Sequence, residues 1–145
     1  MKRQQWPSNP GQKAQLERKI HKVRGRAYIK PGFVKSLTDF FAVLKAKVDI
    51  RVVYDTTQCG LNDALWAPNF FLPTVDSILR NASSATWFGD IDREMFLKCA
   101  LDLDIRMYAG VDVTEVVDAA AGAKQILERW TRTLMGFKLS PFVCT

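Results

Sequence analysis

The sequence has little of what metal-binding and disulfide-bonded proteins depend on. Its 145 residues contain a single histidine, His21, and three cysteines, Cys59, Cys99 and Cys144, which lie far apart and form no CxxC pair. This scarcity argues against a metal site built from thiolates and imidazoles. An odd and sparse set of cysteines also fits a reducing compartment, in which cysteines serve as small core residues.

Long apolar segments are missing as well. The chain has no run of about 18 apolar residues, the length of a membrane-spanning helix, and no apolar segment follows the N-terminal charges as it would in a secretory signal. We therefore expect an intracellular protein with no membrane partner. Internal repeats and low-complexity tracts are also absent, while 48% hydrophobic and 11% aromatic residues are enough for a packed core.

Positive charge is concentrated at the start of the chain. Residues 1–30 hold nine Lys or Arg against one acid, a net charge of +8, whereas residues 31–145 hold twelve bases against fourteen acids, a net charge of −2. We therefore divide the chain into a basic flexible arm with a short helix, 1–30, and a domain, 31–145. Such an arm can neutralise phosphates and bind nucleic acid without reading its sequence, but a solvated tail fits equally well. The candidate nucleic-acid contacts are Lys19, Lys22, Arg24 and Arg26.

The apolar pattern predicts a mixture of helices and strands. Leu16, Ile20 and Val23 share one face if residues 13–24 are helical. Residues 39–54 contain two Phe- and Val-rich runs around a polar centre, which predicts a strand hairpin, although helical spacing competes for the first run. Further along the chain we expect a helix from Pro73, a strand over 86–91, an extended run over 105–113 and a helix over 115–130.

The best candidate for chemistry is an apolar segment that ends in two carboxylates. In Trp87-Phe88-Gly89-Asp90-Ile91-Asp92, the residues Asp90 and Asp92 flank Ile91, so both side chains can face the same side of a strand. Carboxylates held at a strand end suit the Mg²⁺ ions of phosphoryl transfer from a nucleoside triphosphate. Acidic residues at a strand end can also serve solubility alone, so this segment by itself does not decide between the two.

Short motifs surround that segment in a fixed order. They are Phe40-Phe41-Ala42-Val43-Leu44-Lys45, Asp49-Ile50-Arg51-Val52-Val53-Tyr54-Asp55, Leu61-Asn62, Phe71-Leu72-Pro73, Asp90 to Phe96, and Gly136-Phe137-Lys138-Leu139-Ser140-Pro141. In this order they resemble the fingers and palm of reverse transcriptases, and are most similar to the retrotransposon type. The resemblance covers residues 33–145 and implies an α+β fold, an incomplete fingers and palm of a right-hand polymerase preceded by the basic arm. The implied activity is RNA-directed DNA synthesis, with a primer–template, a deoxynucleoside triphosphate (dNTP) and Mg²⁺.

The resemblance also assigns catalytic roles. Asp90 is the first choice for the aspartate that binds the catalytic metal ions and Asp92 the second, with the main chain of Ile91 beside the triphosphate. Phe96 lies six residues after Asp90, where an aromatic ring blocks a ribose 2′-hydroxyl in this family. A plain core aromatic is an equally good interpretation of Phe96.

Basic residues of the predicted hairpin match the triphosphate contacts of the family. They are Lys45, Lys47 and Arg51, and ammonium and guanidinium groups suit phosphate oxygens. A surface hairpin is also commonly lysine-rich for solubility alone. The chain has Leu44-Lys45-Ala46-Lys47 where the family usually has a proline before the lysine and a glycine at the tip.

The end of the chain matches the turn that lies beneath the templating base pair. Gly136 permits a close approach of the backbone to a base or sugar, and Ser140-Pro141 opens the helix that would follow. A plain strand-turn-helix junction would carry the same residues. We expect Asp55 and Asn62 to cap backbone groups in the turn between fingers and palm.

The aromatic-x-Asp-Asp pair that completes the metal site of reverse transcriptases does not occur before Thr145. We therefore expect no polymerase activity from this chain alone. One alternative is a small non-enzymatic protein that binds nucleic acid through the basic arm. A third interpretation, part of an RNA-templated RNA polymerase, is disfavoured by the G-x-x-x-S-P turn.

Overall fold

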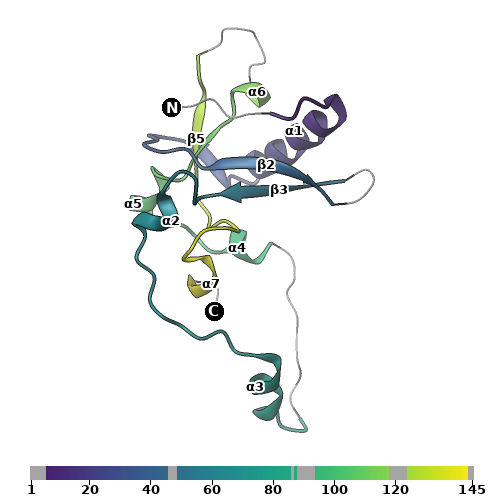
Figure 1. Ribbon diagram of the computed structural model, residues 1–145, viewed down its shortest axis with the longest axis vertical. Helices are drawn as coiled ribbons and strands as arrows, with labels where there is room; N and C mark the ends of the chain where they lie inside the picture. The colour runs from purple at the N-terminus through teal and green to yellow at the C-terminus, as the bar shows by residue number, and fades with distance from the viewer. Residues whose placement is uncertain (1–5, 46–48, 86, 88–93, 118–123, 144–145) are drawn as a thin grey trace.

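The computed structural model describes residues 6–45, 49–85, 87, 94–117 and 124–143. These residues form a mixed α+β fold with two small antiparallel sheets (Figure 1), as the sequence predicts at this coarse level. The helices are α1 (Pro10–Gly25), α2 (Leu61–Ala64), α3 (Val75–Arg80), α4 (Met95–Lys98), α5 (Leu103–Arg106), α6 (Thr114–Val117) and α7 (Ser140–Val143). The strands are β1 (Ile29–Pro31), β2 (Asp39–Leu44), β3 (Ile50–Asp55), β4 (Gly110–Asp112) and β5 (Leu127–Trp130).

Helix α1 includes the helix that the sequence predicts over residues 13–24. It begins after Asn9, whose side-chain oxygen accepts hydrogen bonds from the backbone N–H groups of Gly11 and Gln12 at 2.9 and 3.2 Å. Leu16 and Ile20, one helical turn apart, are 0% and 1% exposed. The helix packs against β1, β3 and α6. Although the division of the chain at residue 30 stays a prediction, α1 is therefore part of the core.

The β2–β3 hairpin predicted over residues 39–54 is confirmed. Phe40 pairs with Tyr54 and Leu44 with Ile50, in antiparallel register. Because successive side chains of a strand alternate between its faces, Phe40 and Ile50 point into the core, where they are 2% and 1% exposed. Phe41 alternates with them and is exposed on the outer face.

The other sheet has the strand order β1-β5-β4, with β5 at its centre. Trp130 of β5 lies opposite Ile29 of β1, and Arg129 lies opposite Gly110 of β4. A Cβ atom at Gly110 would lie 2.2 Å from the Val34 Cγ1 and 2.6 Å from the Ser36 carbonyl oxygen. Only glycine therefore lets the segment before β2 run so close to β4.

The helix predicted over residues 115–130 is wrong. Only α6 is helical there among the described residues, and Leu127–Trp130 forms the central strand. In β5, buried Glu128 and Trp130 alternate with half-buried neighbours, and backbone hydrogen bonds on both edges override a local preference for helix. The extended run predicted over 105–113 is also wrong in its first part, because α5 and a turn precede β4.

Aromatic side chains connect the two sheets in the core. Trp130 is fully buried, and its ring meets that of Tyr54 on the hairpin edge-on, at 5.0 Å between centroids. Tyr54 also contacts Phe40, which in turn meets Trp6 edge-on at 6.0 Å. One core therefore spans both sheets and the N-terminal segment.

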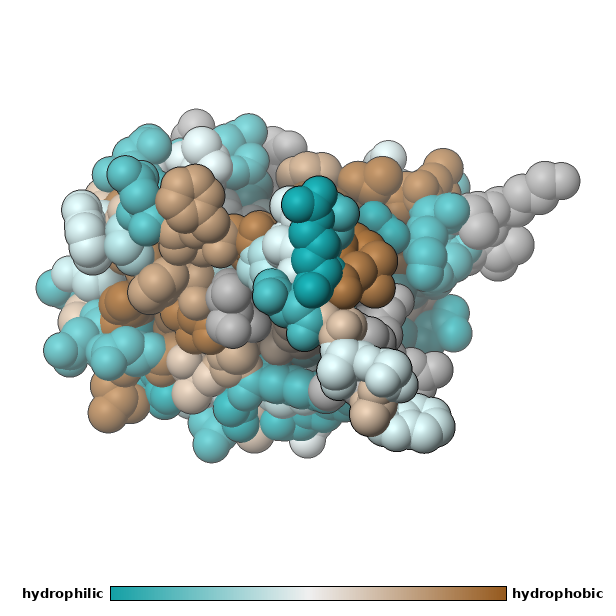
Figure 2. Space-filling model, turned by 90° about the horizontal axis from the view of Figure 1, so that it is seen from below, coloured by the Kyte–Doolittle hydropathy of each residue, from teal (hydrophilic) through white to brown (hydrophobic). Residues whose placement is uncertain are grey.

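Helix α3 lies at the far end of the molecule from both sheets (Figure 1). The helix expected from Pro73 begins at Val75, after a cap in which the Thr74 side chain accepts from the backbone N–H of Ser77. Apolar side chains near α3 are exposed, with Phe71 and Trp87 both at 97%. Figure 2, seen from the α3 side, shows apolar groups among polar ones on this face. The strand predicted over 86–91 falls almost wholly outside the described residues.

A search of the described helices for a membrane span found none of sufficient length and apolar character.

Truncating the buried face of α1 tests whether the helix belongs to the core. We expect Leu16→Ala to lower the free energy of unfolding by about 2–5 kcal/mol, the usual cost of a cavity at a fully buried leucine. The matched control Phe71→Ala removes an exposed side chain and should change it by less than about 0.5 kcal/mol. Urea unfolding measures both, and equal small effects would show that α1 is a loosely attached arm.

Candidate functional site

Part of the predicted site lies outside the described residues: Asp90, Ile91, Asp92 and Lys47. Their catalytic, metal-binding and triphosphate roles stay predictions. Among the residues that the structure does describe, no group of three His, Cys, Asp or Glu side chains is placed to hold a metal ion. The expected Mg²⁺ therefore depends on Asp90 and Asp92 alone, and we derive no metal-dependent step.

Lys45 and Arg51 lie near the tip of the β2–β3 hairpin. The backbone N–H of Lys45 donates to the Asp49 carbonyl at 2.9 Å, and Arg51 lies opposite Val43. Arg51 and Val43 are cross-strand partners and therefore share a face, and Lys45 lies two residues after Val43 on the same face. Both Lys45 and Arg51 are exposed on this outer face. Within the described part of the chain, neither side chain forms a hydrogen bond or ion pair. Both are available to an external anion.

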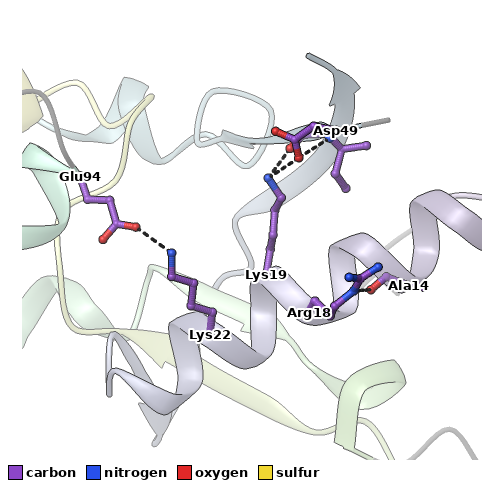
Figure 3. Close-up of polar contacts among 7 residues, drawn as sticks. Ala14, Arg18, Lys19, Lys22, Asp49 and Glu94 are labelled. Carbon is purple, nitrogen blue, oxygen red and sulfur yellow. Dashed lines mark hydrogen bonds and ion pairs between the residues drawn. The ribbon is translucent and has the colours of Figure 1, made fainter. Parts of the chain in front are cut away.

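The four basic residues predicted to bind nucleic acid near the N-terminus are engaged inside the molecule. Figure 3 shows Lys19 reaching the hairpin and Lys22 reaching Glu94. The partners are the Ile50 carbonyl and Asp49 (3.2 Å) for Lys19, Glu94 for Lys22 (3.6 Å) and for Arg26, and Glu128 for Arg24 (2.8 Å). Much of the positive charge that the sequence concentrates in α1 is thus balanced by acids of the domain.

The Lys19 contact attaches the hairpin tip to α1. The hydrogen bond from Lys19 lowers the pKa of the Asp49 carboxyl, helped by the Lys19 charge and the Ile50 backbone N–H. Both side chains are partly exposed, 39% for Lys19 and 52% for Asp49, so water screens the pair. The contact mainly positions the hairpin.

The turn at Gly136 is held against the end of β3. Gly136 has φ = 102°, and a Cβ atom there would lie 2.5 Å from the Tyr54 carbonyl oxygen. The Gly136 carbonyl accepts hydrogen bonds from the Thr56 hydroxyl at 2.7 Å and the Asn62 amide at 2.8 Å. Glycine therefore meets both a backbone requirement and a packing requirement, here against protein backbone.

Asn62 closes this junction from the other side. Its Oδ1 accepts from the Lys138 backbone N–H at 2.9 Å, and the Lys138 ammonium donates to the Leu65 carbonyl at 3.0 Å. Ser140 is buried and donates to the Leu134 carbonyl at 2.6 Å, at the start of α7. The structure thus brings the L-N motif and the G-x-x-x-S-P motif together. Asn62 binds a distant turn as well as its own, which spacing alone does not reveal.

Asp55 has the local role predicted for it. Its Oδ1 accepts from the backbone N–H groups of Thr57 and Gln58 at 2.9 and 3.1 Å. This pattern fixes the turn after β3, and so places Thr56 where its hydroxyl reaches the Gly136 carbonyl.

Phe96 lies in α4 and is half-buried. Its carbonyl accepts a hydrogen bond from the Thr133 hydroxyl, three residues before Gly136. The Phe96 backbone is therefore joined to the segment between β5 and the Gly136 turn. Whether its ring acts as a 2′-hydroxyl gate stays a prediction, because the gate is defined relative to Asp90.

Sequence reasoning missed the acids that organise α1: Asp49, Glu94 and Glu128. Glu128 is 1% exposed and lies 104 residues from Arg24, its ion-pair partner. No local spacing connects residues so far apart. The only available signal was the opposite net charge of the two parts of the chain.

No protein-family model matches this chain, and no similar curated protein was found. The resemblance to reverse transcriptases therefore remains a prediction from the motifs.

Substitution of Gly136 tests the junction. Gly136→Ala should lower the free energy of unfolding by about 1–3 kcal/mol, because alanine is strained at positive φ and its Cβ would meet the Tyr54 carbonyl. Gly25→Ala is the control, since nothing lies within 4 Å of a Cβ there; it should be neutral within about 1 kcal/mol. Thermal and urea unfolding of both variants measure the difference, and equal stability of the two would contradict the geometry.

Alkaline pH should weaken the aromatic contact beside this junction. Burial raises the pKa of the Tyr54 hydroxyl above its usual value. The raised value means that the folded state favours the protonated form, so its stabilising effect is complete below about pH 10 and is lost as the pH rises further. The free energy of unfolding should fall by up to about 1.4 kcal/mol per pH unit for this one proton. Tyr54→Phe should remove that part of the fall, whereas Tyr108→Phe, at the surface, should leave it in place.

Proposed function

We propose that this chain provides the fingers and the front part of the palm of a reverse-transcriptase-like polymerase of the retrotransposon type. The substrates are a primer–template and a dNTP. This proposal accounts together for the order of the motifs, the basic residues of the hairpin and the turn at Gly136.

One observation carries the proposal: two motifs far apart in sequence form a single junction. Asn62 and Thr56 both bind the Gly136 carbonyl, across 74 and 80 residues. If the motif matches were accidental, nothing would require the L-N turn and the G-x-x-x-S-P turn to meet. Their meeting supports the assignment of both to one functional unit.

The distribution of unpaired cations supports a triphosphate contact on the hairpin. Lys45 and Arg51 share an exposed face and form no hydrogen bond or ion pair with a described residue, although the Lys45 charge helps to lower the pKa of Asp49. The four basic residues near the N-terminus, by contrast, are paired with acids: Lys19, Lys22, Arg24 and Arg26. An ammonium group and a guanidinium fork bind phosphate oxygens without first breaking an internal ion pair. The hairpin is therefore a better candidate for an anionic substrate than the paired face of α1.

Each part of the chain then has a defined task. Lys45 and Arg51 neutralise and orient the triphosphate, and the Gly136 turn supports the base pair being formed. Mg²⁺ held by Asp90 and Asp92 would supply charge stabilisation for phosphoryl transfer. The Lys19–Asp49 contact keeps the hairpin in position relative to α1.

Binding of a fluorescent DNA primer annealed to an RNA template tests the proposal. The double variant Lys45→Ala/Arg51→Ala should weaken binding and lower the slope of log K against log salt by about two, because two phosphate contacts are lost. Fluorescence anisotropy over a range of salt concentrations measures the slope. The same variant should lose about tenfold or more in dATP affinity by calorimetry, as expected for lost charge-assisted hydrogen bonds.

Two further double variants serve as controls for the loss of Lys45 and Arg51. Lys35→Ala/Arg80→Ala removes the same charge away from the hairpin and should have a smaller effect. Lys22→Ala/Arg26→Ala, which leaves the Lys19 contact to the hairpin in place, should also have a smaller effect. A larger effect would favour the alternative, a non-enzymatic protein that binds nucleic acid through its basic N-terminal segment. Substitution is preferable to deletion of residues 1–30, because deletion would also remove Leu16 and Ile20 from the core.

A further inference from the structure

A hollow of about 450 Å³ lies between the last turns of α1 and strand β1. His21 and Arg24 of α1, Lys30 of β1 and Glu128 of β5 are among the residues that line it. It is an open depression of the surface and not an enclosed cavity. It is separate from the outer face of the hairpin, and nothing in the proposed function uses it.

Glu128 gives this hollow an unusual polar group. The residue is 1% exposed, and its Oε1 accepts one hydrogen bond from the Arg24 Nε at 2.8 Å. No described residue donates to its other oxygen, Oε2, which is also buried. Buried carboxylate oxygens are normally satisfied, because an unmatched one loses its hydration without compensation. A ligand hydroxyl or amine that displaced the side chains covering Oε2 would supply the missing donor.

Side chains with hydrogen-bond donors line the same hollow as the carboxylate. Neither His21 nor Lys30 makes a side-chain hydrogen bond or ion pair with any described residue. Arg24 uses its Nε for Glu128, and no described residue bonds to its terminal nitrogens. These groups suit an acidic group with several acceptor oxygens, of which a phosphate is the best match.

We propose that this hollow binds a small sugar phosphate, such as the ribose phosphate of a nucleotide. A sugar hydroxyl donates to Glu128 Oε2, while the phosphate oxygens accept from Lys30, His21 and the free edge of the Arg24 guanidinium. The ligand thus needs both a hydroxyl and a phosphate. The same chemistry is present in a free sugar phosphate and at the 5′-phosphorylated end of an RNA strand, whose first ribose keeps its 2′-hydroxyl.

Calorimetric titration of the whole chain tests this site with ribose 5-phosphate, ribose, inorganic phosphate and a short 5′-phosphorylated oligouridylate. We expect ribose 5-phosphate to bind at least about tenfold more tightly than ribose or phosphate, since only it engages both groups. Binding of the oligonucleotide alone, lost on the substitutions below, would identify the strand end as the source. Failure of both phosphorylated ligands to bind more tightly than inorganic phosphate would overturn the proposal.

Substitutions assign the binding to this hollow. Glu128→Gln replaces one carboxylate oxygen with an NH2 group, which donates and cannot accept, and it keeps the size of the side chain. This variant should bind ribose 5-phosphate about tenfold more weakly. Because Glu128 is buried, a melting curve must accompany this variant. His21→Ala/Lys30→Ala changes only exposed residues and should weaken binding about fivefold or more, so the test stands even if Glu128→Gln fails to fold. Lys35→Ala, elsewhere on the surface, is the control. If Glu128→Gln and His21→Ala/Lys30→Ala lose no more affinity for ribose 5-phosphate than Lys35→Ala does, the site is contradicted.

Discussion

The packing of β5 is the constraint on which the rest of this structure depends. The strand lies between β1 and β4 and forms backbone hydrogen bonds to both. Trp130 projects from it against Tyr54 of the hairpin, and Glu128 reaches Arg24 of α1. After β5, the Thr131 carbonyl accepts a hydrogen bond from the Leu101 backbone N–H, and the Thr133 backbone N–H donates to the Cys99 carbonyl. The chain then enters the Gly136 turn. Four residues thus connect the N-terminal helix, both sheets and the C-terminal junction.

The distribution of charge follows from that packing. The sequence places a large excess of positive charge in its first 30 residues, but the fold brings Asp49, Glu94 and Glu128 against α1. The carboxylate of an ion pair offsets part of the charge of its basic partner, and this lowers the net gain when that partner binds a phosphate. The cations best placed for an external anion are therefore those without an internal partner, on the hairpin and around the hollow beside β1.

These two regions have different physical characters. The hairpin face is an exposed strand surface with one charged residue from each side of the turn, which suits a long, multiply charged substrate. The hollow combines donors with a buried acceptor, Glu128 Oε2, which suits a small ligand with two kinds of group. Neither proposal depends on the other, because they share no residue.

Local chemistry in the sequence determined a definite part of this protein. Four features arise from residues that are close together in the chain, so the sequence alone predicts them. They are the hairpin over 39–54, helix α1, the Asp55 turn and the helix opened by Ser140-Pro141. The strand β5 was mistaken for a helix because its identity depends on pairing with β1 and β4. The Asn62–Gly136 junction, the partners of the α1 cations and the hollow at Glu128 join residues that are between 30 (Lys19–Asp49) and 104 (Arg24–Glu128) positions apart. Only the tertiary structure decides such contacts. The same sequence offers each of these residues many possible partners, and the packing of the whole core selects one of them.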